Sequence, residues 1–394
     1  MVPEFQLFDA LRKPLQAFFD PAERVYWPAL VAAVALAPVV LGWRRGLAAL
    51  REGLLARKLW THGSTRADVE LLFVRAILFA LIRLPWVAGT LAGALWVATS
   101  LHTHLGAAER PEWSLPVLAL VYSLVLFVVW DFSRFLLHWA MHRFEVLWSF
   151  HQVHHSAEVL TPLTLYRVHP VESVLYDARG LVTTSLVTGV FLYLFRGTAQ
   201  ELQILGINAL GFLFNVVGGN LRHSHVWLRF GWFERWFLSP AQHQLHHSRD
   251  GFGQRSNYGT WLAIWDRWFG SWLPAPAQRV ADVGLRQANH RFDGVGSMLL
   301  GPIVDAGRVV LARLRRTRWA WSWSGAAAVG VFLLPRIAIG QPASDAAVEE
   351  GPAEDPTMDE PVGESESEPE SESESESESE SESESESESE SESE

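Results

Sequence analysis

The sequence predicts an all-α integral membrane protein, with about four transmembrane helices and a helical, histidine-rich cap on the cytoplasmic face of the membrane. Apolar residues make up 49% of the 394 positions, and several apolar runs are long enough to cross a bilayer. The chain has 19 tryptophans, several of them at the ends of these runs, as is typical of membrane interfaces. Of its 15 histidines, 11 lie between positions 138 and 247, in groups with helical spacing.

Residues 1–114 form an N-terminal membrane-anchoring region with two apolar spans. The first span is expected from Trp27 to Trp43, because tryptophan bounds an apolar run at both ends. Arginine and lysine are concentrated in the loop 44–69, which the positive-inside rule places in the cytoplasm. The second span is expected from Leu71 to Leu101, and Pro85 predicts a kink or a split within it.

A third span is expected from Leu115 to Leu137, running back toward the cytoplasm. Asp131, His138 and His142 are spaced so that they share one face of this helix and its continuation. Ionisable groups at such a depth are costly unless they are paired or ligated, so we expect them to be functional.

An apolar pair follows, Gly180 to Phe195 and Leu202 to Val217, broken by Arg196 and Gly197. Pro170, in the polar stretch before this pair, is expected to be a helix start. We interpret the pair as a hairpin that enters the membrane and returns to the same side. The histidines on either side of it are therefore expected in one compartment, the cytoplasm.

Residues 274–340 comprise an arginine-rich polar segment (275–318) and a last apolar stretch from Trp319 to Gly340. That stretch is either a further crossing or a surface helix. Residues 341–394 end in alternating Ser and Glu, a composition that cannot bury a core and predicts a disordered acidic tail.

The composition excludes several classes of protein. There is no cysteine, so disulfides, thiolate ligands and cysteine nucleophiles are excluded. From Asp345 onward there are 23 acidic and no basic residues, and removing them from the formal charge of −12 leaves +11 for the body. A basic, apolar body suits an anionic membrane surface. Nucleic acid is disfavoured as a partner, because the arginines flank apolar runs and form no separate patch.

Three histidine groups with helical spacing predict a metal centre. Neutral imidazole is a suitable ligand for iron, zinc or copper, and each ring fills one coordination position. Eight clustered histidines are too many for one metal ion, so two ions are expected. No His-Glu-x-x-His and no Gly-x-Ser-x-Gly occurs, which argues against a zinc protease and a serine hydrolase. The groups are His138 and His142; His151, His154 and His155; and His243, His246 and His247.

The motifs around these groups resemble the fatty acid hydroxylase and sterol desaturase superfamily. The resemblance extends from about Leu115 to Leu273, so that 115–273 is expected to be the catalytic domain. It implies a non-heme di-iron oxygenase, with a lipid substrate, dioxygen and an external electron donor such as a ferredoxin or a cytochrome b5-like reductase chain. The motifs are HWAMH, HQVHH, RVHP, SPAQHQLHHS, NYG and WDRWFGS.

The resemblance also implies roles for single residues. Its ligands to two iron ions would be the eight grouped histidines and His223, the isolated histidine after the hairpin. His225 occupies a position where relatives often have asparagine. Outside the ligand set, the candidates for catalytic support are Asp131, His169, Glu172 and Asn220.

The expected function is oxidation of a lipid C–H bond, by hydroxylation or desaturation, in a membrane-bound di-iron enzyme. The alternative is a histidine-rich membrane protein that binds or transports metal. That alternative predicts paired ionisable residues in the middle of the membrane, whereas the histidines here gather at one end of the apolar spans.

Overall fold

A computed structural model of the chain describes residues 26–82, 84–109, 111–195, 219–280, 282–286 and 294–323, with isolated positions 12, 16, 18, 19 and 292. The side chains of 78–88 and 316–323 are not among the described parts. Within these ranges the fold is helical, and pairing between extended segments is limited to two isolated bridges, Phe237 with Leu262 and Ser248 with Val283. The hairpin's second half, 202–217, and the acidic tail lie outside the described residues, as do 324–340 of the last apolar stretch.

Helices α2 (Trp27–Leu41) and α3 (Trp43–Gly53) form an antiparallel pair at the start of the described chain, followed by the short α4 (Arg57–Trp60). The 15 residues of α2 extend over about 22 Å, less than the hydrocarbon core of a bilayer. Helix α2, at the crossing expected for 27–43, is therefore not among the described helices that are long enough to span a membrane. Its buried alanines, Ala33 and Ala37, instead join a core cluster that includes Leu221 and Leu228.

The second predicted span is split at the proline, as the sequence indicates. Helix α5 (Gly63–Ile82) ends and α6 (Leu84–Leu105) begins on either side of position 83, with Pro85 in the first turn of α6. Proline is tolerated there because the first turn has no internal partner for its N–H. Helix α6 extends past the predicted end at Leu101.

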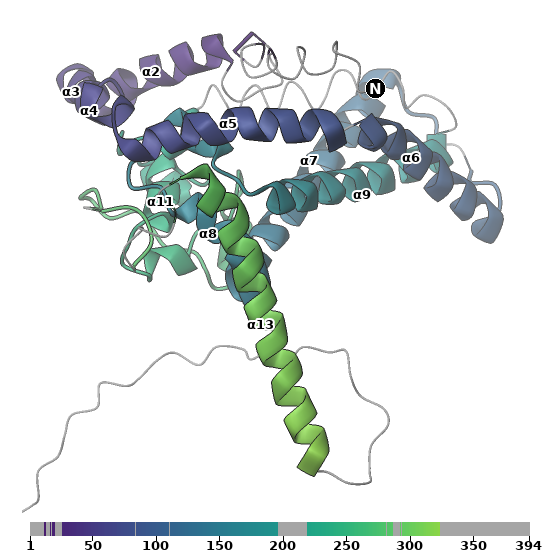
Figure 1. Ribbon diagram of the computed structural model, residues 1–394. Helices are drawn as coiled ribbons and strands as arrows, with labels where there is room; N and C mark the ends of the chain where they lie inside the picture. The colour runs from purple at the N-terminus through teal and green to yellow at the C-terminus, as the bar shows by residue number, and fades with distance from the viewer. Residues whose placement is uncertain are drawn as a thin grey trace, which may run out of the picture. The chain divides into compact units, whose positions relative to one another are not determined.

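Helices α6, α7 (Leu115–Arg143) and α9 (Pro170–Phe195) run side by side (Figure 1). The α6–α9 contact is close because glycine faces it from both helices. A Cβ on Gly93 would lie 2.5 Å from Ser185 Oγ, and one on Gly189 would lie 2.5 Å from Val97 Cβ. Between α7 and α9 the Tyr122 hydroxyl lies 3.0 Å from the hydroxyl of Thr188.

Three helices in the described part are long and apolar enough to cross a membrane: α7, α9 and residues 295–315 of α13 (Val295–Trp323). The first two agree with the spans predicted at 115–137 and from 180, with α9 beginning at Pro170 as expected. The third contradicts the expectation that 275–318 is a polar segment. Its apolar residues include Met298, which is buried against Val153 of the cap and Leu71 of α5.

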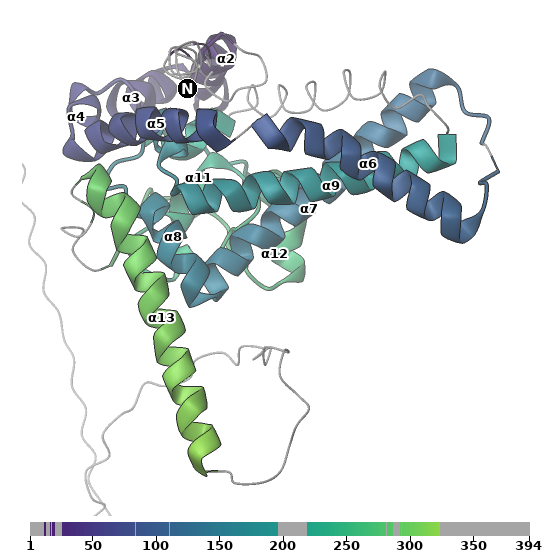
Figure 2. The same cartoon turned by 45° about the vertical axis from the view of Figure 1, so that its right-hand side comes forward.

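The cap between and after these helices is built of short elements. Helix α8 (Glu145–His155) follows α7 directly, and α12 (Ile264–Trp268) lies beside α7 (Figure 2). Phe132 of α7 meets the Trp265 ring of α12 at 5.0 Å between centroids. The other cap elements are η1 (Pro162–Tyr166), η2 (Gly219–His223), η3 (Gly231–Arg235), α11 (Pro240–His246) and η4 (Gly253–Arg255).

Candidate metal centre

The helix α11 carries the third histidine group and is fixed at its start by a capping box. The Ser239 hydroxyl accepts the N–H of Gln242, and the Gln242 side-chain oxygen accepts the N–H of Ser239. Pro240 occupies the first helical position, where its fixed φ suits a helix. This seven-residue helix is fully buried, so its histidines face protein on all sides.

The structure brings all nine expected ligands into two groups. In each group the possible ligand nitrogens lie within 4.8 Å of one another. The histidines at i and i+4 of α8, His151 and His155, belong to the first group, whereas His154 belongs to the second. At α11 the assignment is reversed, because His243 and His247 belong to the second group and His246 to the first. The first group is His138, His142, His151, His155 and His246; the second is His154, His223, His243 and His247.

The two groups adjoin each other. The rings of His155 and His247, one from each group, stack with centroids 4.5 Å apart. Those of His246 and His247 lie 5.6 Å apart. Two ions bound in these groups would therefore be neighbours, with ligands from the same two short helices.

In the first group, three rings direct Nε2 inward because Nδ1 is engaged elsewhere. His138 and His246 donate from Nδ1 to the carbonyl oxygens of Tyr258 and Ser256, each at 2.7 Å. His151 donates to Glu172 Oε1 at 2.9 Å. With the proton on Nδ1, the Nε2 atoms carry lone pairs. The Nε2 of His138 nevertheless lies only 3.1 Å from those of both His151 and His246.

Lone pairs that face each other at this distance repel unless a cation lies among them. A metal ion bound to imidazole nitrogens at about 2.1 Å requires nitrogen atoms no more than about 4.2 Å apart. The 4.8 Å spread of each group needs only a small contraction to meet this requirement. The first group therefore fits a metal ion.

The second group has a different arrangement at one ring. His154 donates from Nδ1 to the carbonyl of Arg167 at 3.3 Å, and its Nε2 lies 3.3 Å from that of His223. The Nδ1 of His243 instead accepts from a guanidinium nitrogen of Arg222 at 3.0 Å. A metal at Nε2 of His243 would require this ring to lose its remaining proton or the Arg222 side chain to move.

Orphaned nitrogens give independent support for the fit. Among the described residues, both ring nitrogens of His155 and of His247 and the Nε2 of His142 are buried without a hydrogen-bond partner. Each such group costs on the order of 1–3 kcal/mol when nothing binds it. A bound cation would remove that cost at one nitrogen of each of the three rings.

Burial also keeps these rings neutral, as ligands must be. Burial is the largest cause that lowers the pKa of His154 to about 3, followed by the nearby His151. It also lowers the pKa well below the usual value for four more histidines of these groups, with neighbouring charges next in order. These are His155, His243, His246 and His247.

The residues predicted to support catalysis lie at different places. Asp131 accepts the N–H groups of Trp261 and Leu262 and the indole N–H of Trp265, so it orders the start of α12. His169 contacts the Leu299 carbonyl of α13 at 3.0 Å and belongs to neither group. Glu172 contacts His151 directly.

Asn220 lies in η2 and His225 just after it, and neither belongs to a histidine group. Asn220 is buried, and its side-chain nitrogen has no hydrogen-bond partner in the described part of the chain. The Nε2 of His225 accepts the N–H of Leu160 at 3.0 Å, and its Nδ1 contacts Arg279. Burial, followed by the charge of Arg279, lowers the pKa of His225 to about 4. It therefore connects loops of the cap.

Two supporting carboxylates were not singled out from the sequence. Asp266 of α12 accepts the N–H groups of Tyr258 and Gly259 at 2.7 Å and the hydroxyl of Ser271. Burial raises the pKa of Asp266 to about 6. It fixes the Tyr258 carbonyl that receives His138. The motif WDRWFGS contains this aspartate and was the signal for it.

The second is Asp68 of α5, which binds Arg167 with an Nη1–Oδ1 distance of 2.8 Å. Both side chains are buried. Arg167 also donates from Nε to the carbonyl of Val153 and the hydroxyl of Ser156, at the end of α8. Its own carbonyl receives His154. No local motif marks Asp68, since its partner is 99 residues away.

Three helices able to cross a membrane and two adjoining groups of imidazoles are typical of one class, membrane proteins with a histidine-rich metal centre. Within it, residues 123–271 match the fatty acid hydroxylase family. These residues belong to the fatty acid hydroxylase superfamily, as the motifs predicted. The match includes every histidine of both groups.

Several characterised proteins are similar to this chain over the same region. An ornithine lipid hydroxylase of Rhizobium tropici is 28% identical over 48% of this chain and 50% of its own length. An alkylglycerol monooxygenase of Xenopus tropicalis is 28% identical over 36% of this chain and 29% of its own. A very-long-chain aldehyde decarbonylase of rice is 28% identical over 38% of this chain and 54% of its own length. The alignments thus span about half or less of each relative. No solved structure matches the chain.

Proposed function

We propose that this protein is a membrane-bound, non-heme di-iron enzyme that oxidises a C–H bond of a lipid with dioxygen and external electrons. The observation that carries the proposal is the convergence of nine histidines, eight of them buried, into two adjoining groups with orphaned nitrogens. Names of the relatives support a lipid substrate, because two are hydroxylases or monooxygenases of lipids.

The chain's residues would hold two iron ions, which supply the activation of dioxygen that C–H oxidation requires. The histidines of the first group would hold one ion and those of the second the other. Carbonyls of the cap and Glu172 set the tautomers of the first group by receiving Nδ1–H. The buried cap excludes water from the centre, which protects reactive species from side reactions.

The proposed orientation places the centre on the cytoplasmic side, where reduced electron carriers are available. The basic loop 44–69 supports it through the positive-inside rule. The donor would be a separate protein, a ferredoxin or a cytochrome b5-like reductase chain, because the sequence has no dinucleotide-binding fingerprint.

The competing function, metal transport, is less well supported. A transport site needs ligands along a path across the membrane. Here the grouped histidines outside α7 belong to short buried cap elements, and those on α7 lie in its last two turns.

The test is lipid analysis of cells with and without the gene, grown under isotopically heavy dioxygen. We expect a lipid that gains a heavy oxygen atom, or a double bond, only when the gene is present. His247→Ala, produced at the same level in the membrane, should give none. Lipid profiles that are identical with and without the gene would contradict the proposal.

A further inference from the structure

Two arginines lie at the contact between the membrane-length helices α7 and α9, beyond the histidine groups. Arg134 and Arg179 place their guanidinium groups over the same indole ring, that of Trp130, at 5.4 Å and 4.6 Å from its centroid. Two positive charges are thus held close together. Ionisable residues inside such helices are normally paired with an opposite charge.

Arg134 makes a hydrogen bond through its Nε, and its guanidinium plane contacts aromatic rings. Its Nε donates to the Thr260 hydroxyl at 3.1 Å, and its guanidinium lies 4.6 Å from the centre of the Tyr176 ring. Within the described part of the chain, its two terminal nitrogens make no hydrogen bond. They can therefore donate to a ligand.

Arg179 is held from the other helix. One terminal nitrogen donates to the Ser133 hydroxyl at 2.8 Å and to the Trp130 carbonyl at 3.2 Å. Its Nε is buried and has no acceptor among the described residues. A buried guanidinium N–H without an acceptor destabilises the folded protein, so an acceptor on a ligand would be favourable here.

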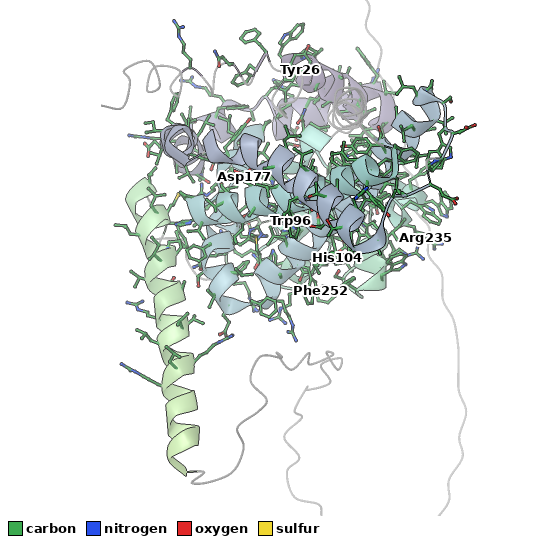
Figure 3. All side chains as sticks on the ribbon, turned by 90° about the vertical axis from the view of Figure 1, so that its right-hand side faces the viewer. Tyr26, Trp96, His104, Asp177, Arg235 and Phe252 are labelled. Atoms are coloured by element: carbon green, nitrogen blue, oxygen red, sulfur yellow. The ribbon has the colours of Figure 1, made fainter. Side chains whose placement is uncertain are left out.

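The carboxylates of Asp131 and Asp177 attract Arg179 from a distance. Among the described residues, however, neither arginine has an ion pair within 4.0 Å. Asp177, two residues before Arg179 on α9 and labelled in Figure 3, makes none with either arginine. The oxygens of Asp131 are taken up by the backbone of Trp261 and Leu262 and by an indole.

We infer that Arg134 and Arg179 bind the anionic head of the lipid substrate, a carboxylate or a phosphate. Guanidinium groups donate in pairs to the oxygens of either anion. The inference rests on the proposed function for its substrate, and it adds what part of the lipid is recognised and where.

The position of the site also predicts which carbon is oxidised. Arg134 precedes His138 by one helical turn, a rise of about 6 Å, on the same face of α7. A lipid whose anion lies at the arginines presents the carbons next to its head to the histidine groups. We therefore expect oxidation near the head and not in the middle of an acyl chain.

The experiment measures equilibrium binding of radiolabelled dodecanoate, dodecyl phosphate and dodecanol to the purified full chain in neutral detergent. The first two should bind more tightly than the alcohol. Arg134→Gln and Arg179→Gln should weaken binding of both anions roughly tenfold to a hundredfold and leave the alcohol unchanged. Arg179→Lys should restore part of the loss. The control is Arg66→Gln, at a side chain 82% exposed, which should change nothing.

Equal binding of the three probes by the native protein would overturn the inference. So would glutamine variants that keep their melting temperature and bind both anions as the native protein does. Competition by inorganic phosphate as strong as that by dodecyl phosphate would overturn the assignment to a lipid. Because binding is measured without turnover, a protein that binds as expected but oxidises nothing would refute the proposed function alone.

Discussion

At the scale of single residues, the contact between Glu172 and His151 has the clearest chemical role. The carboxylate oxygen lies 2.9 Å from Nδ1, and both side chains are 2% exposed. A carboxylate in this position fixes the tautomer of a ligating imidazole and makes its other nitrogen a stronger ligand. Glu172 therefore orients one ring of the first group.

Replacement of Glu172 by Gln should weaken metal binding at the first group roughly tenfold to a hundredfold. The amide oxygen can still accept from Nδ1, but the negative charge is lost. The measurement is metal affinity by competition with a chelator. Glu145→Gln is the matched control, since that carboxylate is 71% exposed and pairs with Arg313 at the surface. An unchanged affinity in Glu172→Gln would show that its charge does not matter to the site.

The ligand histidines could be predicted from the sequence, whereas most of their supports could not. The i, i+3 and i+4 spacings of 151–155 and 243–247 place their rings on helical faces, and this pattern is local. Which group each ring joins is not local. His246 and His247 are adjacent in sequence but belong to different groups, because the two helices must first be placed against each other. Arg222 beside His243 is equally a product of tertiary packing.

At the scale of helices, α5 ties the N-terminal region to the metal centre. Asp68 anchors Arg167, and Thr164 of η1 donates to the other carboxylate oxygen at 2.8 Å. Arg167 in turn holds the end of α8, where His154 and His155 lie. A region outside the matched family residues thus supports the centre.

The variant Asp68→Asn should lower stability by about 3–5 kcal/mol, because it leaves the buried guanidinium of Arg167 without its counter-charge. Metal retention at the second group should fall with it, since the Arg167 carbonyl receives His154. The checks are melting temperature and metal content. Glu70→Gln, two residues away at a side chain 44% exposed, should leave both unchanged. A stable, metal-loaded Asp68→Asn protein would contradict this role for α5.

The helices themselves were only partly predictable. Pro85 indicated the split of the second span, because a proline interrupts the hydrogen-bonding pattern of a continuing helix. Helix α13 was missed, because the window 275–318 averages arginines such as Arg313 with the apolar run around Met298. Helix α2 is apolar but short, and its alanines pack against residues of the cap.

At the scale of the whole molecule, the centre gathers many neutral imidazoles in a buried place. For His154 the folded pKa is about 3, whereas an exposed histidine has a pKa of about 6.5. The unfolded chain therefore binds more protons between these values. The contribution of such a histidine to the free energy of unfolding is complete above about pH 6.5. It is lost as the pH falls toward 3, by up to about 1.4 kcal/mol per pH unit for each histidine.

The metal-free protein should accordingly melt at a lower temperature as the pH falls from about 7.5 to about 5.5. Tryptophan fluorescence of the detergent-solubilised protein during heating is a suitable measurement. The metal-loaded protein should resist this change until protons displace the ions, because protons and metal ions compete for the same ring nitrogens. A melting temperature of the metal-free protein that is independent of pH would contradict the neutral, buried centre.

The proposed orientation can be tested with single cysteines, because the native chain has none. Cysteine at Arg66, Glu109, Glu158 or Arg249 lies at an exposed position and can be labelled with an impermeant reagent. Only the cysteine at Glu109 should react from outside the cell. Outside labelling at Glu158 or Arg249 would place the centre away from its expected electron donor.

The number of metal ions bound per chain tests the central claim most directly. It can be measured on the purified full-length protein by elemental mass spectrometry against amino-acid analysis. Two adjoining histidine groups predict two ions per chain, and His246→Ala and His247→Ala should each lose mainly one, from different groups. Replacement of iron by zinc would change the metal found but not the number. A native protein that binds one ion or none when saturated with iron would contradict the account.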